Sequence, residues 1–149
     1  MMVFLKWTGL IAAVLVLVIV GATVAGALLP VKHVASRTQT FPVAQTRLWE
    51  LVTAAFERMN DGSYAIVEQR PPNQLVTAIV DEKKPYGGTW TYELAPARGG
   101  TSLRVVENGE VYNPFFRFVS RYVIGHARTI DGYFADLQKA AGPAPTART

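Results

Sequence analysis

Glu107 and His126 are the two ionisable side chains that the sequence places among apolar neighbours. Glu107 shares the face of a strand pattern with Leu103 and Val105, and His126 falls within the apolar stripe of a helical pattern. A carboxyl group whose pKa is raised by burial and an imidazole that titrates near neutral pH could move protons on a bound carbonyl compound. The alternative is that both residues are structural. Glu107 would then lie at the solvent-exposed end of its strand, and His126 would be hydrogen-bonded to a backbone carbonyl or to water.

Four aromatic residues with polar tips could form the wall of a pocket for a flat or lipid-like molecule. Trp90 and Tyr92 share one strand face, and Tyr122 and Tyr133 lie on the same helical stripe as the histidine. With the glutamate and the histidine, they make up the predicted ligand-binding set. Aromatic residues at these spacings also fill ordinary cores, so the ligand role depends on free volume between sheet and helix.

Composition narrows the chemistry further. The chain has no cysteine, which excludes disulfide bridges, thiolate metal ligands and cysteine catalysis. One Glu and one His give no recognisable metal spacing, so neither a metal nor a cofactor is expected. Fifteen Lys and Arg against eleven Asp and Glu give a formal charge of +4. The basic residues form no run interleaved with aromatic residues, which argues against nucleic-acid binding.

Three arginines, Arg117, Arg121 and Arg128, lie almost opposite the aromatic stripe of the last helical pattern. They could rest on the phosphate headgroups of a membrane, where each basic residue contributes on the order of 1 kcal/mol. The alternative is a solvated helix face.

The segment from Thr8 to Leu29 contains no charged side chain. About 20 apolar residues suffice to cross the hydrocarbon core of a bilayer, so this segment predicts one membrane-spanning helix, with Trp7 as an interfacial anchor. A cleavable signal peptide is the alternative, because Ala25-Gly26-Ala27 fits a small-residue cleavage pattern. Its apolar region would span only about 7 to 15 residues, fewer than are found here. Basic residues flank both ends, so the orientation stays open.

The remaining patterns alternate as strands and helices separated by Pro and Gly turns. In order they predict strand 34–43, helix 44–60, strands 63–69, 74–80, 89–94 and 101–112, and a long helix from 113 to about 140. Asn113 is expected to cap the long helix, with Pro114 as its first residue.

This order of elements resembles the START-like helix-grip superfamily (SRPBCC). Three segments resemble its bacterial polyketide cyclase/dehydrase-like branch: FPVAQTRLWELVT (41–53), PYGGTWTYELAP (85–96) and TSLRVVENGEVYNPFFRFVSRYV (101–123). The resemblance implies a curved antiparallel sheet around the C-terminal helix, with strand 34–43 paired antiparallel to strand 101–112. Relatives usually carry two more early strands, for which this chain has no residues. A five-stranded sheet with one side of the grip open is therefore expected.

We therefore expect an α+β protein with a transmembrane anchor (1–32), a helix-grip domain (33–141) and a disordered tail (142–149). The predicted function is binding of a small hydrophobic ligand, lipid or polyketide-like, between the sheet and the C-terminal helix. Two alternatives stay open. One is a cyclase/dehydrase-type enzyme that uses Glu107 and His126, and the other is a non-catalytic, membrane-tethered interaction domain.

Overall fold

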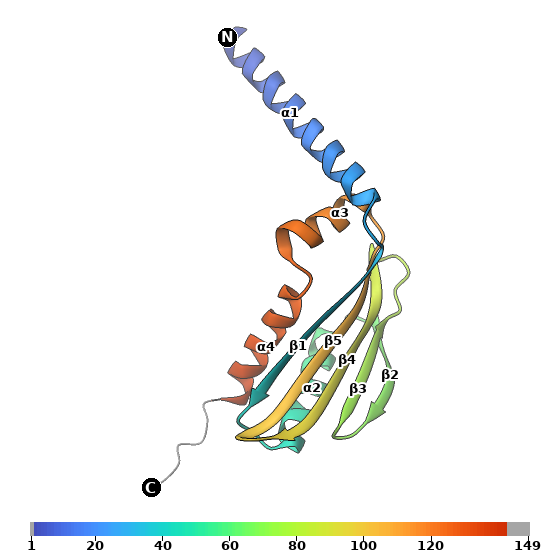
Figure 1. The fold of residues 1–149 in the computed structure, drawn as a ribbon, viewed down its shortest axis with the longest axis vertical. Helices are drawn as coiled ribbons and strands as arrows, with labels where there is room; N and C mark the ends of the chain where they lie inside the picture. Colours follow the sequence, from blue (N-terminus) through green and yellow to red (C-terminus); the bar gives the residue numbers. More distant parts are fainter. Residues whose placement is uncertain (1, 143–149) are drawn as a thin grey trace.

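The computed structural model describes residues 2–142, so the predicted disordered tail lies almost wholly outside the described residues. The elements are α1 (Met2–Ala27), β1 (Lys32–Phe41), α2 (Gln45–Met59), β2 (Tyr64–Arg70), β3 (Gln74–Ile79), β4 (Tyr86–Ala97), β5 (Gly100–Val111), α3 (Pro114–Val119), the π-helical turn η1 (Ser120–Ile124) and α4 (Arg128–Ala141). The chain has the expected α+β fold, with one apolar helix at its N-terminus (Figure 1).

The five strands form one antiparallel sheet in the order β1-β5-β4-β3-β2. The predicted pairing of the first strand with the last is confirmed, with a register that runs from Lys32 opposite Glu110 to Phe41 opposite Thr101. The other neighbours are joined by short connections, as expected for a meander. Strand β1 therefore lies at one edge of the sheet, beside the last strand of the chain.

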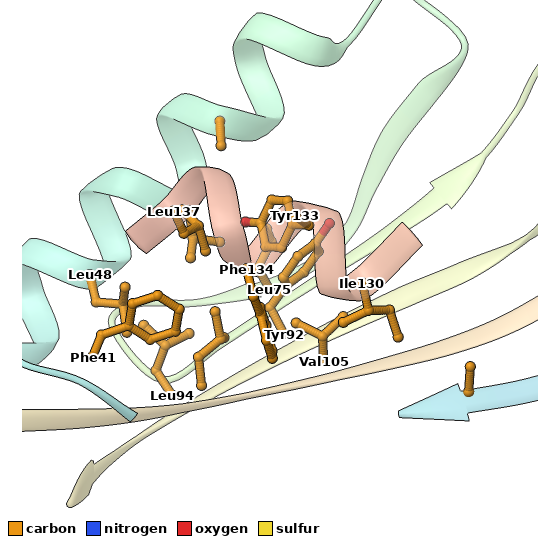
Figure 2. Close-up of a cluster of buried hydrophobic side chains, with 14 residues drawn as sticks. Phe41, Leu48, Leu75, Tyr92, Leu94, Val105, Ile130, Tyr133, Phe134 and Leu137 are labelled. Atoms are coloured by element: carbon orange, nitrogen blue, oxygen red, sulfur yellow. The ribbon is translucent and has the colours of Figure 1, made fainter. Parts of the chain in front are cut away.

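Helices α2 and α4 contribute to a single core on one face of the sheet (Figure 2). Apolar residues alternate along the strands and recur at three and four along the helices, which directs them to the same layer. The core contains Phe41, Leu48, Val52, Ala55, Leu75, Tyr92, Leu94, Leu103, Val105, Ile130, Tyr133, Phe134 and Leu137. Full burial of each large apolar side chain contributes about 1.5–3 kcal/mol to folding.

The single C-terminal helix predicted from 113 to about 140 is wrong, because the helix is interrupted in its middle. The expected cap is present, since Asn113 accepts a hydrogen bond from the backbone N–H of Phe116 at 3.2 Å. Helix α3 then passes into η1, whose turn is closed by a 2.9 Å bond from the Gly125 N–H to the Ser120 carbonyl. Gly125 has a φ of +82°, a conformation that ends the helix and favours glycine. His126 therefore lies in a linker before α4 and not on a helix.

Helix α1 projects away from the sheet and packs on α3 near its own C-terminal end (Figure 1). Ala22 is buried there, and a side chain at Gly26 would collide with the carbonyl group of Pro114. The Arg117 guanidinium donates to the Leu29 carbonyl at 2.8 Å, just beyond the end of α1. The part of α1 from Trp7 to Ala27 is long and apolar enough to cross a membrane, and most of it is exposed.

Truncation of a central core residue should reveal how much the fold depends on this layer. Leu103 on β5 is fully buried, so Leu103→Ala is expected to lower the free energy of unfolding by about 2–5 kcal/mol. The matched change Val67→Ala, at an exposed position of the edge strand β2, should stay within about 0.5 kcal/mol of the parent. Chemical denaturation of the full chain in detergent micelles, followed by tryptophan fluorescence, measures both. Equal losses would contradict this description of the core.

Candidate functional site

The two predicted ionisable residues gather around a third residue, His33, which sequence analysis did not select. His33 begins β1, Glu107 lies on β5, and His126 lies in the linker between η1 and α4. The His33 ring stacks on the His126 ring, with centroids 3.9 Å apart and an interplanar angle of 17°. The Nε2 atom of His33 is 3.7 Å from Oε1 of Glu107. We refer to His33, Glu107 and His126 as the histidine–glutamate cluster.

Strand pairing and a glycine place His33 in this cluster. In the β1–β5 register Ala35 lies opposite Glu107 and His33 lies opposite Gly109, so His33 and Glu107 are diagonal neighbours on one face. A side chain at Gly109 would meet the imidazole ring, so the missing Cβ makes room for it. The predicted strand began at residue 34, one residue too late to include His33. The predicted antiparallel pairing, extended by one residue, was the signal that could have found it.

The polar contacts of His126 come from the preceding turn. Its Nδ1 atom lies 3.0 Å from the Ser120 hydroxyl oxygen, which holds the ring orientation across the linker. The contact partner of Glu107 within the cluster is His33, so the predicted Glu107–His126 pair is connected through His33. Any proton relay in this region would involve all three residues.

Burial drives each member of the cluster toward its neutral form. Desolvation, followed by the neighbouring His126, lowers the pKa of His33, and desolvation followed by Arg121 lowers the pKa of His126. Desolvation raises the pKa of Glu107, and a hydrogen bond from Trp90 partly opposes this shift. The His33 and Glu107 side chains are only 13% and 17% exposed. Their Nε2 and Oε1 atoms are 3.7 Å apart, and burial favours the uncharged form of both side chains. Their contact is therefore weaker than a hydrogen-bonded ion pair.

One carboxylate oxygen of Glu107 remains without a partner. Its Oε2 atom is buried and makes no hydrogen bond within the described residues. A buried polar atom without a partner costs about 1–3 kcal/mol and needs an explanation. Trp90 lies directly opposite Glu107 on β4, so the carboxyl group sits at the border between polar cluster and aromatic core.

The predicted aromatic wall is largely packed core. Tyr92 and Tyr133 are buried, with ring centroids 5.6 Å apart, and Trp90 lies 6.0 Å from Tyr92 and 6.2 Å from Tyr133. Burial raises the pKa of both tyrosines, and the Tyr133 hydroxyl is buried without a hydrogen-bond partner in the described part of the chain. Figure 2 shows these two tyrosines among the aliphatic core residues. Tyr122 is exposed and lies apart from them.

A small cavity lies beside the cluster. Its volume is about 20 Å³, and it is lined by Leu29, Pro30, Val31, Lys32, His33, Val111, Arg117, Arg121 and His126. This is room for one water-sized group. A larger and more open hollow of about 580 Å³ lies where the β1–α2 connection meets the β4–β5 turn. Of the six residues predicted to bind a ligand, His126 is the one that lines either hollow.

The three predicted headgroup arginines have different environments. Arg117 is half-buried, and its guanidinium donates to the carbonyl groups of Leu29 and Tyr112. Arg121 and Arg128 are exposed. Within the described residues, no group of three or more His, Asp or Glu side chains is arranged to hold a metal ion.

Comparisons with known proteins concern the fold. No protein-family model and no curated protein match the chain. Among solved structures, protein MLL2253 from Mesorhizobium loti is 12% identical, with a TM-score of 0.53 over 73% of this chain and 96% of that one. CalU16 from Micromonospora echinospora is 14% identical, with a TM-score of 0.52 over 78% and 86%. Protein CV1439 from Chromobacterium violaceum is 12% identical, with a TM-score of 0.51 over 74% and 97%.

These structures match over most of their own length, so the likeness covers a whole domain and not an isolated motif. The chain is an α+β protein of helix-grip architecture, in which an antiparallel five-stranded sheet holds a C-terminal helical segment. Membership of the polyketide cyclase/dehydrase-like branch and the absence of two early strands stay predictions.

Acidification should destabilise the protein through the two histidines. Because the folded-state pKa values of His33 and His126 are lowered, the unfolded chain binds more protons as the pH falls below about 6.5. Their contribution to stability is present above that pH and is lost below it. Glu107 acts in the opposite sense, since its raised pKa favours the folded state at low pH and this contribution is lost as the pH rises.

The double variant His33→Gln/His126→Gln isolates the histidine contribution. Denaturation curves at about pH 7.5 and about pH 5.5 should show a smaller loss of stability on acidification for the variant than for the parent. An equal loss in both proteins would contradict the assigned role of the stacked pair.

Proposed function

We propose that this protein is a single-pass membrane protein whose helix-grip domain binds a small, largely apolar molecule beside the histidine–glutamate cluster. The observation that carries the proposal is the buried Oε2 atom of Glu107, which has no partner among the described residues, on a carboxyl group whose other oxygen lies 3.7 Å from the Nε2 atom of His33. Buried polar atoms at such positions commonly serve to orient a ligand.

The chemistry of the cluster indicates what the polar part of the ligand is. Both imidazoles have lowered pKa values and the carboxyl group has a raised one, so the three cluster residues favour their uncharged forms. The basic side chains of Lys32, Arg117 and Arg121 line the adjoining cavity. A hydroxyl or carbonyl group can exchange hydrogen bonds with neutral imidazole and with a carboxyl group. We therefore expect the part of the ligand that meets the cluster to be a neutral oxygen group on an apolar molecule. The adjacent Trp90 provides the apolar contact.

The position of the cluster favours a ligand that arrives from the membrane. His33 follows the end of α1 after a short connection, and the adjoining cavity is lined by residues of that connection and by β5. Because the cavity holds only about 20 Å³, a larger ligand has to displace the linker between η1 and α4. That linker contains Gly125 and is not regular helix, so its displacement breaks few backbone hydrogen bonds.

A non-catalytic interaction domain is the second candidate, and the packing of Trp90, Tyr92 and Tyr133 favours it. These three rings fill the space between sheet and α4 that an internal ligand would occupy. An enzyme that uses the Glu107–His126 pair remains a weaker alternative, since His33 stands in contact with both residues.

Replacement of Glu107 tests the binding proposal. Glu107→Leu keeps the side-chain volume but removes the polar partner, so a compound that co-purifies with the parent should be reduced about tenfold or more. Glu93→Leu is the matched control, because Glu93 is paired with Arg104 at 3.1 Å on the outer surface of the sheet. The measurement is mass spectrometry of an organic-solvent extract of the full chain purified in detergent.

Loss of the compound in Glu107→Leu and its retention in Glu93→Leu would support the proposal. If the folded parent protein yields an empty extract and binds no hydrophobic fluorescent probe, ligand binding is refuted and the interaction domain becomes the leading candidate.

A further inference from the structure

Helix α3 and the turn η1 expose a group of large apolar side chains. Four side chains that lie close together in sequence are between 51% and 68% exposed: Phe116, Tyr122, Val123 and Ile124. We call these four residues the α3–η1 patch. A cluster of large exposed apolar residues usually marks a surface that contacts another protein or a membrane.

The contact of α1 with α3 determines the depth at which this patch would lie in a membrane crossed by α1. Ala22 and Gly26, in the last turns of α1, lie against α3. At 1.5 Å per residue, Ala22 lies about 7.5 Å before the end of the helix at Ala27. Interfacial helices bury their apolar face about 5–10 Å into the boundary between headgroups and acyl chains. In a bilayer crossed by α1, α3 therefore lies at the depth of an interfacial helix.

This level is held by several contacts and not by a flexible tether. Gly26 allows the backbone of α1 to approach the Pro114 carbonyl group, and any larger residue there would collide with it. Arg117 donates to the Leu29 and Tyr112 carbonyl groups, which connects α3 to both neighbouring segments. Helix α3 lies against the C-terminal end of α1 (Figure 1), so the position of the α3–η1 patch is coupled to the direction of α1.

The charges around the patch match a membrane surface. Arg121 is exposed, and its guanidinium lies 5.9 Å from the centre of the Tyr122 ring. Lys32, at the start of β1, is also largely exposed and is paired with Glu110 at 3.5 Å. Basic and aromatic side chains next to apolar ones are typical of segments that lie at the headgroup level. Arg117 is engaged with backbone carbonyl groups, so Arg121 is the better candidate for headgroup contact.

We propose that the α3–η1 patch is inserted into the interfacial layer of the bilayer that α1 crosses, so that α1 and α3 form a two-part anchor. The apolar side chains enter the acyl boundary and Arg121 contacts the headgroups. The anchor holds the histidine–glutamate cluster close to the membrane surface, because the cavity beside the cluster is lined by residues that follow α1 and by Arg117 of α3.

The test uses the absence of native cysteines to place one fluorescent label at a time. Full-length Val123→Cys, labelled with a polarity-sensitive dye, is reconstituted in vesicles of phosphatidylcholine and phosphatidylglycerol. The label should be quenched by lipids that carry a nitroxide near the headgroup and be protected from aqueous iodide. Val67→Cys, at an exposed position of β2 far from α1 in sequence, should be quenched by iodide and not by lipid. Val16→Cys, within α1, should be quenched by deep nitroxides.

A fourth protein tests the coupling between the two parts of the anchor. Gly26→Leu, combined with the label at Val123, should lose quenching by lipid because the larger residue displaces α3 from α1. The label in the middle of α1 should be unaffected by the same substitution.

Three results would overturn the proposal. The first is iodide quenching at position 123 equal to that at position 67. The second is protection at 123 from both quenchers that increases with the ratio of protein to lipid, which would show that a second copy covers the patch. The third is failure of deep nitroxides to quench the label at 16, which would place α1 outside the bilayer.

Discussion

Antiparallel pairing of β1 with β5 is the contact on which the other features of this structure depend. It joins the beginning of the domain to its last strand over ten residue pairs. By this pairing His33 comes next to Glu107, and the end of α1 comes next to the start of α3. These neighbours are more than 70 residues apart in sequence, so loop-closure entropy opposes their meeting and the backbone ladder must offset it. Both the candidate site and the membrane-proximal helix pair follow from one strand pairing.

Sequence patterns predicted most of this framework because local periodicity and topology agree. Alternation in β4 and β5 placed Tyr92, Leu103 and Val105 on the core face, and Asn113 was recognised as a cap. The break in the last helix could not be seen, because the apolar spacing continues on both sides of Gly125. A glycine inside a helix costs only about 1 kcal/mol, so its presence alone does not predict a break. The π turn and the Ser120–His126 contact decide the outcome, and these depend on tertiary packing.

The candidate site was predictable in part for a related reason. The partial burial of Glu107 follows from its strand face, which the sequence shows directly. The stacking of His33 on His126 requires both the exact start of β1 and the position of a linker that was expected to be helix. The predicted aromatic wall shows a second thing that sequence patterns do not give, which is the free volume of a pocket. Spacing identifies which rings face the core, but free volume depends on how Trp90, Tyr92 and Tyr133 pack against one another.

A partly buried carboxyl group beside a tightly packed aromatic core is costly for a small domain. Replacement of Glu107 by an apolar residue would remove a buried oxygen that has no partner within the described chain, so stability alone does not account for the glutamate. The same argument applies to the Tyr133 hydroxyl, on the α4 side of the core. Selection for a uniquely packed core would favour apolar residues at both positions. In the proposed function the bound ligand supplies a partner for the Glu107 oxygen, which accounts for the polarity of that residue where stability does not.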